Sequence, residues 1–352
     1  MKKKHYVYPF ALTLGLGLLA FTLSCRMSTR IADFYALAVY PPFSTFLSWL
    51  ASCVPFSLQD VALLSIIGTA VGIIIVSIRQ KWGLRRALKW EVLLLLCTFD
   101  WFYMAWCNNY YRSSIYSRTQ IQLTAYDERE FRDFLNDFAA RTNAEWTTER
   151  ALPGTVLEEE IKAFYNHMPA TFGLTEARSW QHPKPSIFNG FYSAVGVLGT
   201  MEPLFSESYI NQDIQPFDYP FVFAHEYAHL LGISSEAECN WWAYHACLSS
   251  RHQAVRYSAM KNILPHVMHN AQSFLSEDEY KSWADGLRPE VIADLRHTSI
   301  HWNALRSPLL RKIHEVTYDL FLKGNHISSG RQNYSEVVGM LLSIKLQGTD
   351  SK

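Results

Sequence analysis

Three early segments of the chain are rich in large apolar residues and nearly free of charge. They cover about residues 6–24, 60–78 and 90–107; the second has one acidic residue, Asp60, at its very start, and only the third has one in its interior. A helix of this length crosses roughly 30 Å of hydrocarbon. The pattern therefore predicts three transmembrane helices within a membrane region of residues 1–108.

Basic residues give these predicted helices a direction. Lys2, Lys3 and Lys4 precede the first helix, and five more Lys and Arg residues lie between positions 79 and 89, where the second helix turns into the third. Cytoplasmic loops carry the excess of Lys and Arg. We therefore expect both basic stretches inside the cell and everything after residue 108 outside the cell membrane. A cleaved signal peptide is the alternative for the first segment.

The stretch between the first two predicted helices, residues 31–58, is rich in aromatic residues and proline. Pro41 and Pro42 would interrupt a transmembrane helix. We expect a half-buried helix or loop at the outer membrane surface here.

The remaining residues, 109–352, are long enough to form a domain with its own core. In several segments apolar residues recur every three to four positions and acidic residues occupy the other positions, which predicts amphipathic helices. Ser276 and Glu279 have the spacing of a capping box at a helix start. The other expected helices cover residues 127–140, 156–167, 236–250, 301–321 and 334–346.

One stretch of this outer domain has a different pattern. Residues 188–214 are rich in glycine, aromatic and β-branched residues, and they directly precede the motif described next. This composition predicts two or three short strands.

The sequence His-Glu-x-x-His occurs at residues 225–229. On a helix, His225 and His229 share one face, so both rings can point at one ion. Two imidazoles and a carboxylate suit Zn²⁺, with a fourth position left for water. Glu226 is placed to take a proton from such a water, whose pKa the metal lowers. The alternative is an ordinary amphipathic helix that carries two histidines at this spacing by chance and binds no metal.

The third ligand is expected just after this helix. Gly232 favours the end of the helix, because glycine accepts the left-handed conformation there. Ser234 or Ser235 can cap a following helix. Glu236, at its start, is the expected ligand and Glu238 is the second choice. The two side chains project about 200° apart, so we do not expect both on one ion.

Charge balance and cysteine spacing bear on the partners and the disulfides that we expect. The chain has 32 basic and 32 acidic residues, and this balance gives no reason to expect a nucleic-acid partner. Cys239 and Cys247 are eight residues apart on one expected helix, about 12 Å along its axis. That is too far for a disulfide, so we expect an outer domain without one.

A hydrolase of this kind also needs a hydrogen-bond donor for the oxyanion. His326, Arg331 and Tyr334 follow a glycine-containing loop near the end of the chain. His326 and Tyr334 are our candidates for a residue that reaches over the metal. Exposed polar residues without such a role are the alternative.

The chain resembles a family of bacterial membrane-anchored proteins of unassigned function, which have N-terminal transmembrane helices and an outer His-Glu-x-x-His domain. Four stretches carry the resemblance: residues 54–60, 109–112, 224–240 and 320–334. The family is similar to zinc peptidases whose third ligand is a glutamate. That similarity implies His225 and His229 as ligands and Glu226 as general base.

The same resemblance implies two further features. Such peptidases often contain Glu-x-x-x-Asp, in which the aspartate supports the first histidine; here the frame runs from Glu236 to Asn240, so Asn240 is expected in that place. Cys239 stands where the family favours alanine. These peptidases also pair an extended substrate with an edge strand beside the site. Residues 196–201 are our candidate, and a small meander that only packs against the helix is the alternative.

The expected fold is mainly α, with transmembrane helices followed by an α+β zincin-like domain that has a small β-sheet beside the His-Glu-x-x-His helix. The expected function is that of a zinc-dependent peptidase, anchored in the cell membrane by several helices and acting outside it. Its expected partners are the lipid bilayer and a peptide or protein substrate. A zinc-stabilised module that binds or senses an envelope ligand without cleaving it is the alternative.

Overall fold

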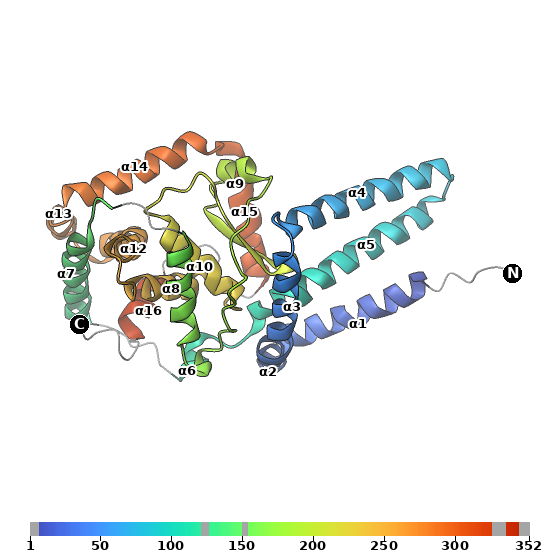
Figure 1. Cartoon of the computed structure of the whole chain (residues 1–352), viewed down its shortest axis with the longest axis horizontal. Helices are drawn as coiled ribbons and strands as arrows, with labels where there is room; N and C mark the ends of the chain where they lie inside the picture. Colours follow the sequence, from blue (N-terminus) through green and yellow to red (C-terminus); the bar gives the residue numbers. More distant parts are fainter. Residues whose placement is uncertain (1–6, 121–126, 150–153, 326–335, 345–352) are drawn as a thin grey trace. The chain divides into compact units, whose positions relative to one another are not determined.

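The computed structural model describes residues 7–120, 127–149, 154–325 and 336–344 of the chain. Most of these residues are helical, and two short strands form a sheet, so the mainly α prediction is confirmed (Figure 1). The chain divides into two compact units. Unit 1 contains residues 1–113 and 202–207, and unit 2 contains residues 114–201 and 208–352.

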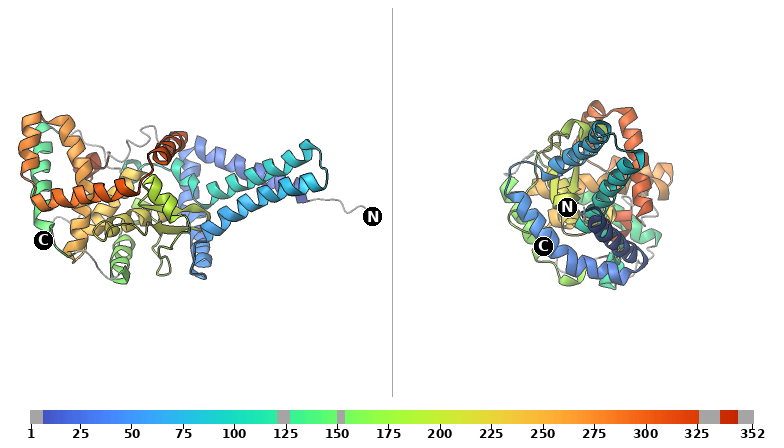
Figure 2. Two further views of the ribbon diagram at one scale, coloured as in Figure 1. Left: turned by 90° about the horizontal axis from the view of Figure 1, so that it is seen from above. Right: turned by 90° about the vertical axis from the view of Figure 1, so that its right-hand side faces the viewer.

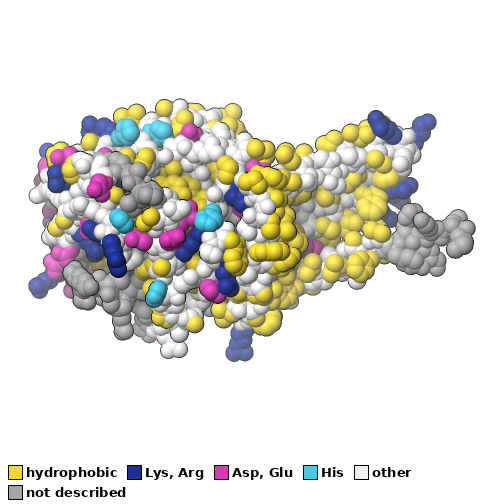
Figure 3. Space-filling view, in the orientation of Figure 1, with side chains coloured by type: hydrophobic (Ala, Val, Ile, Leu, Met, Phe, Trp, Pro, Cys, Tyr) yellow, Lys and Arg dark blue, Asp and Glu magenta, His cyan; other side chains and the backbone are white. Residues whose placement is uncertain are grey.

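Unit 1 is built from helices. Among the described residues, α1 (Val7–Met27) and α4 (Leu58–Arg79) are long and apolar enough to cross a membrane. Few of their residues are buried inside the protein, and hydrophobic side chains cover much of the surface of this unit (Figure 3). The unit also contains α2 (Thr29–Phe34), a π-helix (Tyr35–Val39), α3 (Tyr40–Ser52), α5 (Leu84–Ala105) and a 3₁₀-helix (Cys107–Tyr111).

Helix α5 contains most of the third predicted transmembrane segment. Four charged residues between positions 85 and 91, together with Asp100, reduce its apolar character. By length and composition it does not join α1 and α4 as a membrane-spanning candidate among the described residues. The third crossing therefore stays a prediction.

The stretch between α1 and α4 is helical for most of its length. Pro41 and Pro42 lie in the first turn of α3 and do not interrupt a helix. The first N–H groups of a helix have no partner within it, so proline loses no hydrogen bond there.

The turn between the two strands belongs to unit 1 and is fastened to the N-terminal end of α4. Ser57, the N-cap of α4, accepts a hydrogen bond from the backbone N–H of Asp60 (3.1 Å) and donates one to the Glu202 carboxylate (3.0 Å). The backbone N–H of Gln59 donates to the Glu207 carboxylate (2.9 Å). Both glutamates are buried. The free N–H groups and the positive end of the helix dipole stabilise such carboxylates.

Unit 2 is organised around α10 (Tyr219–Leu230), α11 (Glu236–Leu248) and α12 (Gln253–Phe274), which pack against one another. The other helices of the unit lie around these three (Figure 2). They are α6 (Ile115–Thr119), α7 (Glu128–Glu145), α8 (Gly154–Asn166), a 3₁₀-helix (Ala170–Phe172), α9 (Asn189–Val195), α13 (Glu277–Asp285), α14 (Pro289–Leu305), α15 (Pro308–Gly324) and α16 (Val337–Ser343).

The capping box of Ser276 and Glu279 is confirmed at the start of α13. The single helix predicted over residues 301–321 is wrong, because α14 ends at Leu305 and α15 begins at Pro308. Proline disfavours the helical conformation for the residue before it, and Ser307 is extended. The backbone N–H of Ser307 instead donates to the carbonyl oxygen of Ala194 (2.8 Å).

Residues 188–214 contain two strands, as predicted, but also a helix that was not. β1 (Gly199–Glu202) and β2 (Glu207–Ile210) form a two-stranded antiparallel hairpin, whose turn contains a 3₁₀-helix (Pro203–Phe205). The preceding residues form α9, which ends at Gly196 in the left-handed conformation (φ 79°). The proposed edge strand of residues 196–201 is thus wrong in its first half.

Cys239 and Cys247 are free thiols, as expected.

Candidate metal site

The histidines of the motif lie on α10, in the interior of unit 2. Asp218 precedes this helix and forms a buried ion pair with Lys261 of α12. Lys261 also donates a hydrogen bond to Thr298 of α14 (2.8 Å). Because both charges are buried, their mutual pairing and this additional bond are needed to offset the loss of water. The start of α10 is thereby fixed to two neighbouring helices.

The turn after α10 has the conformation that the sequence indicates. Gly232 is left-handed (φ 95°), and the backbone N–H of Ile233 reaches back to the carbonyl oxygen of Ala228 (3.2 Å). Ser235 is the N-cap of α11, and its side chain accepts a hydrogen bond from the backbone N–H of Glu238. This tight turn places Glu236, the first residue of α11, against the histidine face of α10.

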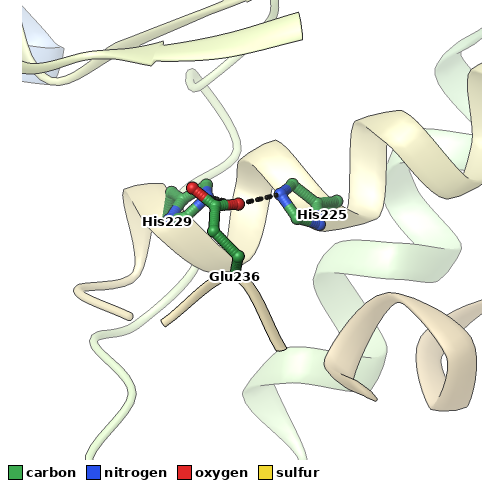
Figure 4. Close-up of side chains that lie close together, drawn as sticks. All are labelled: His225, His229 and Glu236. Atoms are coloured by element: carbon green, nitrogen blue, oxygen red, sulfur yellow. Dashed lines mark hydrogen bonds and ion pairs between the residues drawn. The ribbon is translucent and has the colours of Figure 1, made fainter. Parts of the chain in front are cut away.

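Three side-chain atoms meet at this point. Glu236 Oε2 lies 3.1 Å from His225 Nε2 and 3.3 Å from His229 Nε2 (Figure 4). All three residues are buried, and their candidate ligand atoms lie within 4.8 Å of one another. Ligands that sit 2.0–2.1 Å from a tetrahedral Zn²⁺ are separated by roughly 3.3 Å. The two carboxylate–imidazole spacings therefore match those of a metal-binding group.

The outer nitrogens of both imidazoles face hydrogen-bond acceptors. His225 Nδ1 lies 2.8 Å from Asn240 Oδ1, and His229 Nδ1 lies 2.7 Å from the carbonyl oxygen of Ile233. A ring that donates from Nδ1 keeps the Nε2 lone pair for a metal. Asn240 thus lies where we predicted it, and both rings fit a metal at Nε2.

The two imidazoles favour the ionised form of Glu236. Burial disfavours the ionised Glu236 carboxylate, but His229 and His225 outweigh this effect and hold its pKa well below the ordinary value. Cys239 Sγ lies 3.3 Å from His229 Nδ1, and burial raises the pKa of this thiol to about 12. Cys239 is therefore a neutral thiol beside the histidine and faces its outer nitrogen.

Glu226 lies between α10 and strand β1 and is buried. A Cβ atom at Gly199 would be 2.7 Å from Glu226 Cγ, so only glycine allows the strand to approach this closely. The backbone N–H of Met201 donates to the Glu226 carboxylate. Burial is the largest influence on the pKa of Glu226 and raises it above the ordinary value. A raised pKa makes a carboxylate a stronger proton acceptor.

A protein-family model described as a protein of unknown function, DUF3810, matches residues 35–342. The chain belongs to this family. The matched region contains the metal-binding group and both candidate strands, and it confirms the resemblance to a family of unassigned function. No curated protein and no solved structure matches the chain.

Glu238, the second choice for the third ligand, has other partners. It forms a buried ion pair with Arg118 of α6 and accepts a hydrogen bond from Trp242 Nε1 (3.3 Å). Arg118 also donates to the carbonyl oxygen of Phe172 (3.1 Å). The 200° difference in direction along α11 explains why Glu236 faces the histidines and Glu238 faces α6.

Tyr318 is a site residue that the sequence did not single out. Its hydroxyl donates a hydrogen bond to Glu236 Oε1 (2.5 Å), the carboxylate oxygen that does not contact His225 and His229. It lies on α15, and its ring stacks on His314 one turn earlier. Because one continuous helix was predicted over residues 301–321, the start of α15 was not recognised. The side of α15 that faces Glu236 could therefore not be predicted. The available signal was Pro308, which marks the start of a new helix.

Two predicted site residues cannot be placed. His326 and Tyr334, our candidates for the oxyanion, lie outside the described residues, as does Arg331. Their roles stay predictions.

Proposed function

We propose that this DUF3810 protein is a membrane-anchored, zinc-dependent peptidase. The observation that carries the proposal is the convergence of His225, His229 and Glu236 on one point, with Glu226 one residue after the first histidine. The ligand set of two imidazoles and one carboxylate is typical of catalytic zinc, whereas structural zinc sites use mainly cysteine. In the group that the described residues form, no ligand is a cysteine.

Each residue of the candidate site has a defined role in the proposed hydrolysis. His225, His229 and Glu236 hold the metal, and Asn240 and the Ile233 carbonyl orient the two rings. A bound Zn²⁺ would supply an acidified water and polarise a substrate carbonyl. Glu226 accepts the proton of that water and returns it to the leaving amine. The hydrogen bond from Met201 and the contact with Gly199 keep the Glu226 carboxylate in place.

The strand beside the base supports a peptide as the substrate. β1 pairs with β2, and the hairpin is the complete sheet among the described residues. An extended peptide can add through backbone hydrogen bonds to the edge of such a strand that β2 does not pair with. Because Gly199 and Met201 contact Glu226 directly, a peptide on that edge would run past the base. The residues of β1, rather than the whole stretch 196–201, are thus our candidate.

The membrane location rests on unit 1. α1 and α4 are candidate membrane-spanning helices, and α5 is the proposed third. Basic residues gather where α4 ends and α5 begins, at Arg79, Lys81, Arg85, Arg86 and Lys89, which favours a cytoplasmic position for this end of the two helices. By that rule unit 2 would lie outside the cell membrane, where its substrates would be peptides or envelope proteins.

The substitution Glu226→Gln tests the catalytic role. The amide cannot accept the proton, so we expect hydrolysis of casein and of a mixed peptide library to fall by about 10²–10⁴-fold. Zinc content, measured by mass spectrometry on the purified full chain, should stay at the wild-type level. Glu290→Gln, which changes an exposed glutamate of α14, is the matched control.

Full hydrolysis by the Glu226→Gln variant would refute the assignment of the base. Absence of hydrolysis in the wild type, with zinc bound and the fold lost in His225→Ala, would instead favour the zinc-stabilised binding or sensor module.

A further inference from the structure

Helix α15 has an apolar stripe that the other described residues of unit 2 leave exposed. Leu309, Ile313, Val316 and Leu320 are exposed to 69%, 53%, 54% and 65%. At 100° per residue these four side chains fall within about 60° of the helix circumference. The stripe continues over three turns, whereas a single exposed leucine would need no explanation.

The other side of α15 faces the metal-binding group. Tyr318 reaches Glu236, and Leu322 is fully buried. Tyr318 lies about 165° around the helix from the centre of the stripe. The inward contacts therefore fix the rotation of α15 and hold the stripe outward.

Two more large apolar side chains are exposed on or just before a helix that packs against α15. Helix α9 packs against α15, and the backbone bond from Ser307 to Ala194 ties the start of α15 to it. Phe191 on α9 is 52% exposed, and Ile187 just before α9 is 71% exposed.

The polar residues beside the stripe include long basic side chains, which suit the headgroup layer of a lipid bilayer. Lys312 and Lys323 lie next to it in angle, and both are exposed. Lys323 pairs with Asp319 (2.7 Å), and Arg311 pairs with Glu315 (3.8 Å). The three basic and two acidic residues of α15 leave an excess of one positive charge. Long basic side chains can lie along an apolar surface and keep their charge in the polar headgroup layer.

We propose that α15 lies in the interface of a lipid bilayer, with this stripe among the acyl chains and Lys312 and Lys323 among anionic headgroups. A helix with one apolar face and a charged border binds in that manner. The same chain contains α1 and α4, which are long and apolar enough to cross a membrane, so with the proposed membrane location a lipid surface lies beside the protein. The bilayer then holds the helix that carries Tyr318. This inference does not depend on hydrolysis.

Spin labels on the full chain test the proposal. The exposed cysteines Cys53 and Cys97 are first replaced by serine. A nitroxide is then attached at Ile313→Cys, Val316→Cys or Leu320→Cys, with Arg311→Cys as the matched control away from the stripe. The protein is reconstituted in vesicles of phosphatidylcholine and phosphatidylglycerol. Electron paramagnetic resonance measures the accessibility of each label to oxygen, which concentrates in lipid, and to a polar nickel complex.

We expect a several-fold higher ratio of oxygen to nickel accessibility at the three stripe positions than at residue 311. Equal, nickel-dominated accessibility at all four positions would overturn the proposal. Low accessibility to both reagents would also overturn it, because a protein surface would then cover the stripe. Dipolar broadening at residue 313 would identify that surface as a second copy of the chain.

Discussion

Helix α11 supplies Glu236 to the candidate metal-binding group and α15 supplies Tyr318, which hydrogen-bonds Glu236, but the two helices are held in very different ways. Nearly every residue of α11 is buried, including Glu236 and Asn240. Of the residues of α15, only Leu322 is buried. A helix with few buried contacts opens locally at a lower free energy than one inside the core. The ligands are thus preorganised, whereas Tyr318 is presented by an element that needs further support.

The largest expected effect separates the two glutamates of α11. Glu236→Ala should abolish stoichiometric metal binding, because it removes a ligand. Glu238→Ala should keep the metal but lower the free energy of unfolding by about 3–5 kcal/mol, since Arg118 is left buried without its carboxylate. Zinc content and thermal unfolding in detergent measure the two effects. Replacing Arg118 and Glu238 together by methionine is the control, and it should restore most of the stability.

Metal loss from Glu238→Ala together with retention in Glu236→Ala would contradict the assignment of the third ligand. It would also remove the distinction between the two faces of α11.

A smaller effect is expected from the close contact between β1 and α10. In Gly199→Ala the new methyl group would meet Glu226, so the carboxylate or the strand must shift. A displacement of about 1 Å can cost roughly 10²-fold in rate, while the three ligands stay in place. Gly190→Ala is the matched control, because nothing lies within 4 Å of a Cβ atom there. Unchanged kcat in Gly199→Ala would show that β1 does not position the base.

The smallest effect concerns α15. Tyr318→Phe keeps the ring that stacks on His314 and removes only the hydrogen bond to Glu236. Loss of such an outer contact weakens metal binding by about 10-fold or somewhat more. Competition with a chelator measures this change, and Tyr280→Phe on α13 serves as control. If Tyr318→Phe weakened zinc binding as much as Asn240→Ala, α15 would be as firmly placed as α11, and the contrast between them would be lost.

Local sequence signals were reliable where short-range geometry decides the structure. The glycine turn, the serine cap and the spacing of four residues were enough to place Glu236 beside the histidines. The supporting position of Asn240 came from resemblance, and it lies at His225 as expected. Each of these features depends on residues within one helix–turn–helix segment.

Predictions from the local sequence failed where contacts between distant segments determine the secondary structure. Residues 189–195 have a strand-like composition but form a helix that packs against α14 and α15. At Ser307 the local signal of Pro308 was overlooked, and a backbone hydrogen bond to Ala194, more than 100 residues earlier, adds to the break. Intrinsic preferences are weak enough for such tertiary contacts to override them.

Hydropathy and helical periodicity are properties of neighbouring residues, so they were enough to predict the apolar helices of unit 1 and the atoms able to hold a metal. What surrounds those atoms follows from the packing of distant helices. Tyr318 is 82 residues from Glu236, and Arg118 is 120 residues from Glu238. Which of many polar side chains meets a given carboxylate over such distances depends on how whole helices pack, and packing is fixed by the complete core rather than by any local pattern.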